Sequence, residues 1–309
     1  MQDCMKRRLL YASSQAYEPH KEPAERRVGW IEPPIVVRRE TKLGHRQIDQ
    51  ALVGRVREGV VVAFRGSLPP FVGGYDGWLV LLDWLNDGLS LCVEDSDYAG
   101  GVHLGFAESV RRLWEDKDGT PGVASAIACL FDQSRCDGRA GQHLFVTGHS
   151  KGGALANLAA FRAAQVPAWR GLPISVATIA AARAGNGVFA QAYDASRIAC
   201  LRYEVSTDLI PHLPPGPATP RWLRILARHF GPKLVTDDYH PVGLRVAGKP
   251  AHEPWLKTWL RDLWGMITFR GISLHGLTPA ALAAHTICPR SGYDRLICTG
   301  EPDCGHGLH

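Results

Sequence analysis

Residues 148–152, Gly-His-Ser-Lys-Gly, constrain the fold of this 309-residue chain more than any other segment. The run before them, 143–147, has the composition of a short buried strand, and the Ala- and Leu-rich run after them, 153–161, is typical of a helix. Glycine at both ends removes β-carbons that would collide with the neighbouring strand or helix. The segment therefore predicts a tight strand-to-helix turn with Ser150 at its tip.

A Gly-x-Ser-x-Gly turn between a strand and a helix is the nucleophile elbow of α/β-hydrolases, which exposes a serine at the carboxyl edge of a sheet. A serine hydroxyl becomes an effective nucleophile when a histidine takes its proton and a carboxylate orients that histidine. We therefore expect Ser150 to be a nucleophile. The alternative is a tight turn in which the serine is incidental.

The rest of the chain alternates strand-like and helix-like runs. Strands are expected over 30–39, 47–57, 59–64, 143–147, 174–180 and 198–205. Helices are expected over 1–20, on both sides of 119–122 with the second ending near Phe131, and over 153–161. This order predicts an α/β protein of the α/β-hydrolase fold, with a mostly parallel central sheet and helices on both faces. Residues 1–309 are expected to form a single domain, with a Pro-rich insertion at about 211–254 that contains nine prolines.

Composition excludes several classes of partner and cofactor. The net charge of +5 is spread along the chain, so nucleic-acid binding is not expected. The eight cysteines have no C-x-x-C spacing, and neither a metal nor another cofactor is expected. No signal-peptide pattern and no apolar run of about 20 residues is present, which predicts a cytoplasmic protein or one exported without a cleavable signal peptide.

The partners of Ser150 are sought downstream, because in α/β-hydrolases the acid and then the histidine follow the serine. Asp208 is favoured as the acid, since it lies just past the strand 198–205; the other candidates are Asp194, Glu204, Asp237 and Asp238. The histidines His212, His229, His240, His252, His275 and His285 all follow Asp208, and His212 is too close in sequence to reach the nucleophile easily. Spacing alone leaves His275 and His285 both open as the base, because both lie late in the chain.

Several segments together resemble the class 3 (fungal-type) triacylglycerol lipases in order and spacing, over roughly residues 50–295. They are Phe64-Arg65-Gly66-Ser67, Asp83-Trp84-Leu85-Asn86-Asp87, Val102-His103-Leu104-Gly105-Phe106, Val146 to Ala156, Ala184-Gly185-Asn186 and Asp208 to Pro214. The resemblance implies Ser150 as nucleophile and Asp208 as acid. It also implies that the segment 239–243 is the family's structural histidine–glycine strand, so that His240 is not the base.

The resemblance favours His285 as the base, because His285 and Tyr293 look like the family's H-x-x-x-Y segment. The spacing is longer than usual and Ala284 stands where an aspartate is usual, so His275 remains the rival. The family's oxyanion hole would be the backbone N–H groups of Lys151 and Ser67, two donors that stabilise a tetrahedral anion. For Ser67 the alternative is a simple turn residue.

The expected function is that of a serine carboxylic-ester hydrolase acting on lipid or acyl esters through a Ser-His-Asp triad and an acyl-enzyme. Phospholipase A1-like or thioesterase activity on the same triad is an alternative, and so is a non-catalytic binding protein if no histidine reaches Ser150. The resemblance implies that the loop 68–82 is the family's lid, although ordinary core packing explains Leu79 to Leu82 equally well. The apolar face of 255–264 is expected to pack in the core or to make transient contact with a membrane or lipid surface.

Overall fold

The computed structural model describes residues 3–20, 28–41, 47–67, 91–205, 208, 210–219, 238–248, 285, 293, 296 and 297. Its centre is a seven-stranded sheet in the order β1-β2-β3-β6-β7-β9-β11. The strands are β1 (Ile35–Thr41), β2 (Gln47–Val56), β3 (Gly59–Phe64), β6 (Leu144–His149), β7 (Ile174–Ile179), β9 (Ala199–Val205) and β11 (Leu244–Gly248). All pairs from β3 to β11 are parallel, and β1 and β2 add an antiparallel edge. The prediction of a mostly parallel sheet is confirmed.

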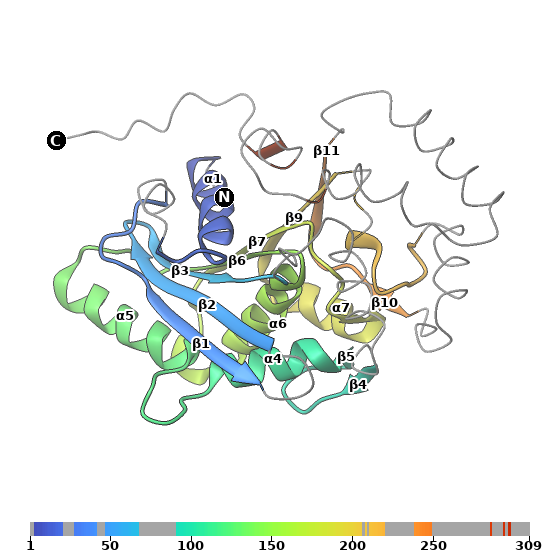
Figure 1. Cartoon of the computed structure of the whole chain (residues 1–309), viewed down its shortest axis with the longest axis horizontal. Coiled ribbons are helices and arrows are strands. Elements are labelled where there is room, and N and C mark those ends of the chain that lie inside the picture. Colours follow the sequence, from blue (N-terminus) through green and yellow to red (C-terminus); the bar gives the residue numbers. More distant parts are fainter. Residues whose placement is uncertain are drawn as a thin grey trace.

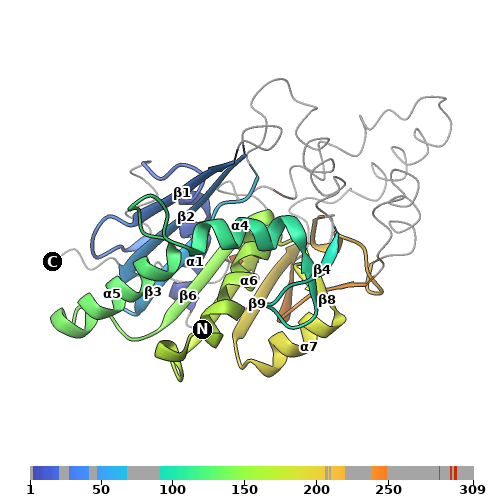
Figure 2. The same cartoon turned by 90° about the horizontal axis from the view of Figure 1, so that it is seen from below.

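Helices cover both faces of this sheet, as predicted. In Figure 1, α1 (Asp3–Gln15) lies above the strands, and α4 (Leu104–Trp114), α5 (Val123–Asp137) and α6 (Lys151–Gln165) lie below them. The same three helices, with α7 (Gly187–Ala195), stand in front of the strands in Figure 2. No helix among the described residues is long and apolar enough to cross a membrane.

The pleat of the buried strands divides the apolar core into two layers. In β3, Val60, Val62 and Phe64 join the layer that contacts α4, α5 and α6, whereas Val61 and Ala63 join the layer that contacts α1. Successive side chains of a strand point to opposite faces, and every residue of β3 is buried. A continuous β-branched run is therefore what a strand covered on both faces requires.

A second, four-stranded antiparallel sheet was not predicted. It has the order β10-β8-β5-β4, from β4 (Cys92–Glu94), β5 (Gly101–His103), β8 (Gly185–Asn186) and β10 (Tyr239–His240). Strands of two or three residues are too short for an alternating pattern in the sequence. Two single-turn helices, η2 (Pro167–Trp169) and η3 (Ile210–His212), complete the described elements.

The segment predicted as an insertion, 211–254, is not an insertion throughout. Its strand β11 pairs in parallel with β9, with Leu244 opposite Leu201, and so extends the central sheet. The high proline content of the segment suggested an insertion, but the prolines only flank the run 242–249. This run contains no proline, so its N–H groups can donate to a sheet ladder. The parts 220–237 and 249–254 lie outside the described residues.

Two element boundaries also differ from the expectation. β1 begins at Ile35 and not at Trp30, since Pro33 and Pro34 lack the N–H groups of a strand ladder. Helix α5 continues to Asp137, past the expected end near Phe131, and stops where Gly138 takes a left-handed conformation (φ 65°).

Candidate active site

Ser150 forms the turn between β6 and α6 in a conformation that side chains seldom adopt. Its backbone has φ 58° and ψ −129°, and the residue is only 3% exposed. A β-carbon on Gly148 would lie 2.1 Å from the carbonyl oxygen of Gly152, and one on Gly152 would lie 2.2 Å from that of Phe64. The two glycines thus permit the close approach of strand, turn and helix, and the strain falls on the serine.

Asp208 and His285, 77 residues apart in sequence, are brought together. His285 Nδ1 lies 2.9 Å from Asp208 Oδ2, and Asp208 is fully buried just beyond the end of β9. An ionised carboxylate only accepts hydrogen bonds, so Nδ1 is the donor and Nε2 is the other ring nitrogen available for chemistry. The backbone N–H of Ile210 donates to Asp208 Oδ1 over 3.0 Å and helps to orient the carboxylate. The rival base, His275, lies outside the described residues.

Tyr293 makes a further contact with the same carboxylate. Its hydroxyl group donates to Asp208 Oδ2 over 2.6 Å and accepts from the backbone N–H of Val205 over 3.1 Å. Burial, followed by the charge of Asp208, raises the pKa of Tyr293 well above its ordinary value, so the hydroxyl keeps its proton as a donor. The sequence suggested Tyr293 only as part of the His285 segment and gave no sign of this contact.

A chain of hydrogen bonds begins at Tyr17, just after the end of α1, and reaches the backbone of His285. It passes through His149, the residue before the serine. Tyr17 Oη lies 2.9 Å from His149 Nδ1, and His149 Nε2 lies 2.6 Å from the carbonyl oxygen of His285. The rings of His149 and His285 are also in contact, with centroids 4.5 Å apart and their planes tilted by 39°. Burial, and then the nearby His285, lower the pKa of His149 well below its ordinary value.

The tautomer of His149 follows from these partners. A carbonyl oxygen only accepts, so the neutral ring carries its proton on Nε2, and Nδ1 accepts from the Tyr17 hydroxyl. His149 is therefore a hydrogen-bonding residue, as expected for it. The part of Tyr17 was missed, because nothing in the sequence connects residues 132 positions apart.

The two expected oxyanion donors belong to two segments that meet at the serine. Lys151 begins α6, where first-turn N–H groups can donate outside the helix. Ser67 follows Gly66, at which a β-carbon would lie 3.2 Å from Ser150 Cβ, so this end of the β3 chain runs beside the nucleophile. The role of both N–H groups as oxyanion donors stays a prediction.

The side chain of Lys151 takes part in a buried ion-pair cluster. Its Nζ lies 2.9 Å from Asp49 Oδ1 of β2, and Arg112 Nη2 of α4 lies 2.7 Å from Asp49 Oδ2. Burial alone would raise the pKa of Asp49, but Lys151 and Arg112 together hold it below the ordinary value. The cluster ties the start of α6 to β2 and α4.

Other expected features are structural or undescribed. His103 is fully buried, caps α4 by accepting from the Phe106 N–H, and has its pKa lowered to about 3 by burial and by the charge of Lys151. Within the described ranges, no three His, Cys, Asp or Glu side chains lie together as a metal site requires. The lid-like loop 68–82 and the apolar run 255–264 lie outside those ranges.

Comparisons with known proteins identify the family and the fold of the chain. A model of the class 3 lipase family matches residues 61–217, about half of the chain. Lipase ZK262.3 of Caenorhabditis elegans is 42% identical over 165 residues, which are 53% of this chain and 40% of that protein; the chain thus spans less than half the length of this relative.

Solved structures share the fold at low identity. Lipase II from Rhizopus niveus is 20% identical with a TM-score of 0.53, and the alignment covers 80% of each chain. The lipase from Rhizopus microsporus var. chinensis is 21% identical with a TM-score of 0.51, over 82% of this chain and 74% of that one. Both likenesses support the α/β-hydrolase fold. With the family match over half of its length, the chain belongs to the class 3 lipase family.

Proposed function

We propose that this protein is a serine carboxylic-ester hydrolase that acts on lipid or acyl esters. The observation that carries the proposal is the 2.9 Å hydrogen bond between His285 and Asp208. The ring of His285 contacts that of His149, the residue before the serine of the strained elbow. Membership of the lipase family supports an ester substrate with an acyl chain. The His285–Asp208 pair and the elbow conformation of Ser150 support a mechanism of nucleophilic catalysis.

In the proposed reaction, Ser150 Oγ attacks the ester carbonyl carbon while His285 Nε2 takes the hydroxyl proton. Asp208 holds Nδ1–H and stabilises the imidazolium that forms. The N–H groups of Lys151 and Ser67 donate to the oxyanion; removal of one such donor costs about 3–4 kcal/mol of transition-state stabilisation. Collapse of the tetrahedral intermediate expels the alcohol, which receives its proton from His285, and leaves Ser150 acylated.

Water completes the cycle. His285, neutral again, takes a proton from the water molecule that attacks the acyl-enzyme, and returns it to Ser150 Oγ as the carboxylic acid leaves. The same steps would hydrolyse a phospholipid at one acyl position or an acyl thioester. Release of fatty acid from triacylglycerol, phospholipid and acyl-thioester substrates, measured side by side, separates these three substrate classes.

Labelling by a fluorophosphonate probe tests the nucleophile. We expect the wild-type protein to be labelled and Ser150→Ala to remain unlabelled, while Ser134→Ala, a buried serine on α5, is labelled as the wild type is. A wild-type protein that resists the probe would support the non-catalytic alternative. The base is tested by comparing His285→Ala with His275→Ala, and full activity of His285→Ala overturns the assignment of His285.

A further inference from the structure

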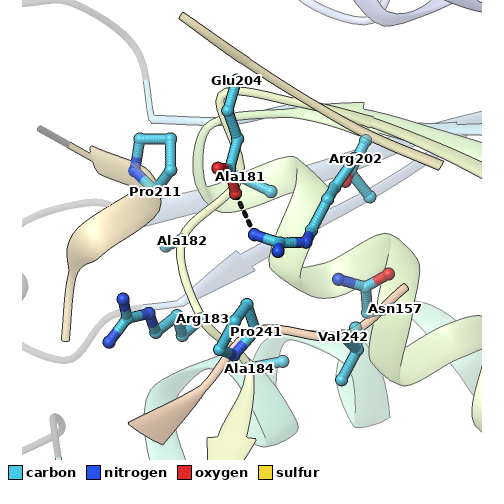
Figure 3. Close-up of a pocket in the computed structure, with 11 residues that line it drawn as sticks. Asn157, Ala181, Ala182, Arg183, Ala184, Arg202, Glu204, Pro211, Pro241 and Val242 are labelled. Carbon is cyan, nitrogen blue, oxygen red and sulfur yellow. Dashed lines mark hydrogen bonds and ion pairs between the residues drawn. The ribbon is translucent and has the colours of Figure 1, made fainter. Parts of the chain in front are cut away.

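Two buried carboxylates of the central sheet each pair with two basic side chains in the described part of the chain. One is Glu204 of β9, which pairs with Arg202 of the same strand and with Arg245 of the neighbouring strand β11. Figure 3 shows the pair with Arg202 beside a small pocket. Backbone hydrogen bonds already join β9 to β11, so this cluster reinforces a connection that the sheet ladder makes.

The other carboxylate, Asp49 of β2, joins a strand to two helices, which no sheet ladder can do. Its Oδ1 lies 2.9 Å from Lys151 Nζ of α6, and its Oδ2 lies 2.7 Å from Arg112 Nη2 of α4. The Asp49 side chain is 1% exposed and that of Lys151 is 9% exposed, so salt screens this pair weakly. Separating the two charges would leave each of them buried without compensation. Asp49 therefore holds Lys151 at a fixed place relative to the sheet.

The anchored side chain and the first expected oxyanion donor belong to the same residue. Lys151 begins α6 directly after Ser150, and its backbone nitrogen is bonded to the same Cα as the anchored side chain. A β-carbon on Gly152, the next residue, would lie 2.2 Å from the carbonyl oxygen of Phe64, so the start of α6 has little room to move toward the end of β3. The ion pair and this close packing together restrict the position of the Lys151 N–H.

The neighbouring residue of β2 holds the segment that carries the second expected donor. The carbonyl oxygen of Gln50 accepts a hydrogen bond from the Arg65 N–H over 3.0 Å, and Ser67 follows Arg65 by two residues. Asp49 and Gln50 are adjacent in one strand of a paired sheet, so their separation is fixed. One short stretch of β2 thus holds both donor segments, one through a side chain and the other through the backbone.

We propose that Asp49 is a positioning residue of the oxyanion hole, which sets the Lys151 N–H against the Ser67 N–H through its ion pair with Lys151. The assignment rests on the proposed function, since it concerns the same reaction. Preorganised donors act on the charge that develops in the transition state more than on the neutral carbonyl group of the bound ester. Loss of the anchor should therefore lower kcat and leave KM nearly unchanged.

Lys151→Met tests the anchor most directly, because methionine keeps the backbone N–H and much of the side-chain length but removes the ion pair. Asp49→Asn removes it from the other side. We expect kcat to fall about 10-fold in each variant, with KM within about twofold of the wild-type value. Rates are expressed per active site, counted by titration with a fluorophosphonate, so that unfolded protein does not contribute.

Inhibitors separate a positioning role from a general distortion of the site. An alkyl boronic acid forms a tetrahedral anion on a nucleophilic serine, so its affinity should weaken in Lys151→Met by the same factor as kcat. A long-chain alkyl ether has no carbonyl oxygen for the donors to bind, and its affinity should stay at the wild-type value. An ether that also binds more weakly would mean a distorted substrate site and would overturn the proposal.

The double variant Asp49→Asn/Lys151→Met tests whether the two residues act through one interaction. Its kcat should be no lower than that of the weaker single variant, since the anchor is lost only once. Losses that multiply overturn the proposal, because Asp49 would then act independently of Lys151.

Asp95→Asn is the matched control. Its carboxylate is also buried, with a side chain 8% exposed, and pairs over 2.6 Å with Arg111, the α4 residue next to Arg112. This variant loses a comparable ion pair and should keep the wild-type kcat and boronic-acid affinity per active site. If Asp49→Asn does not fold, Lys151→Met decides the question. A wild-type protein without ester turnover contradicts the proposed function and this role together, whereas an active wild type with an unaffected Lys151→Met overturns the role of Asp49 alone.

Discussion

Tyr293→Phe isolates the hydrogen bonds of one hydroxyl group that lies against Asp208. The side chain is fully buried; its hydroxyl donates to Asp208 Oδ2 over 2.6 Å and accepts from the Val205 N–H over 3.1 Å. Phenylalanine keeps the ring packing and removes both bonds. A hydrogen bond to a charged group contributes about 1.5–3 kcal/mol, and an N–H left unsatisfied in the interior costs about 1–3 kcal/mol. Since such terms are not additive, we expect the free energy of unfolding to fall by about 2–4 kcal/mol.

Two other buried tyrosines calibrate this number. Tyr193 donates to the neutral amide oxygen of Asn157 over 3.3 Å, so Tyr193→Phe should cost about 1 kcal/mol. The hydroxyl of Tyr98 is buried without a hydrogen-bond partner in the described structure, so Tyr98→Phe should cost nothing. Urea denaturation at pH 7 measures all three variants. Equal losses in the three would refute the reasoning, because the loss would then come from removing any buried hydroxyl group and not from the contact with the carboxylate.

Activity should respond less than stability in Tyr293→Phe. Asp208 keeps its bonds to His285 and to the Ile210 N–H, so the histidine stays oriented. We expect kcat/KM to fall about tenfold, which corresponds to about 1.4 kcal/mol. A loss as large as that of Asp208→Asn would mean that the hydroxyl group, and not the carboxylate, is what holds His285.

Three further predictions test other parts of the structure. Tyr17→Phe removes the hydroxyl group that donates to His149 and so helps to position the His285 backbone. We expect kcat to fall about 2- to 10-fold, with KM nearly unchanged and the shape of the pH profile kept. An unchanged kcat rejects this positioning role. The pKa of Asp49 is depressed in the folded state, so its ion pairs stabilise the protein fully above the unfolded pKa of about 3.9. This contribution is lost as the pH falls through the folded pKa. The free energy of unfolding, measured from pH 6 to pH 2, should therefore fall with pH, and Asp49→Asn should reduce the slope of that fall. Gly152→Ala places a β-carbon 2.2 Å from the Phe64 carbonyl oxygen and should yield little folded protein. The control is Gly119→Ala, whose β-carbon meets no atom within 4 Å; because the φ angle there is 73°, this change should lower the free energy of unfolding by only about 1 kcal/mol. Similar folded yields of the two variants would contradict the steric argument.

The sequence predicted best what local chemistry determines. The elbow at Ser150 and the buried strand β3 each carry their pattern within about ten residues, and Asp208 was found because strand ends are marked by the change in hydrophobicity. The second sheet was missed because its strands have two or three residues. The contacts of Tyr17 and Tyr293 were missed for a different reason: they join segments more than 80 residues apart, and a single sequence carries no record of such pairing.

The choice between His275 and His285 shows the same limit. Chain order restricts the base to the end of the sequence, but two histidines ten residues apart satisfy that order equally. The tertiary contact with Asp208 favours His285. The role of β11 was obscured in a related way, because the surrounding prolines dominated the composition of a segment whose own residues pair with β9.

The docking of α1 has a consequence for the order in which the protein assembles during synthesis. The apolar face of α1, with Met5, Leu9 and Leu10, packs against strands that include Phe145, and Ser13 bonds to Thr147, 134 residues further on. At about 5–20 residues per second, the ribosome needs on the order of 10 s to complete that distance. Throughout this interval only the earlier part of that apolar layer, such as Val61 and Ala63 of β3, is available to α1. Part of the apolar face of the helix therefore stays exposed to chaperones, and the hydrogen bond from Tyr17 to His149 cannot form until β6 has been made.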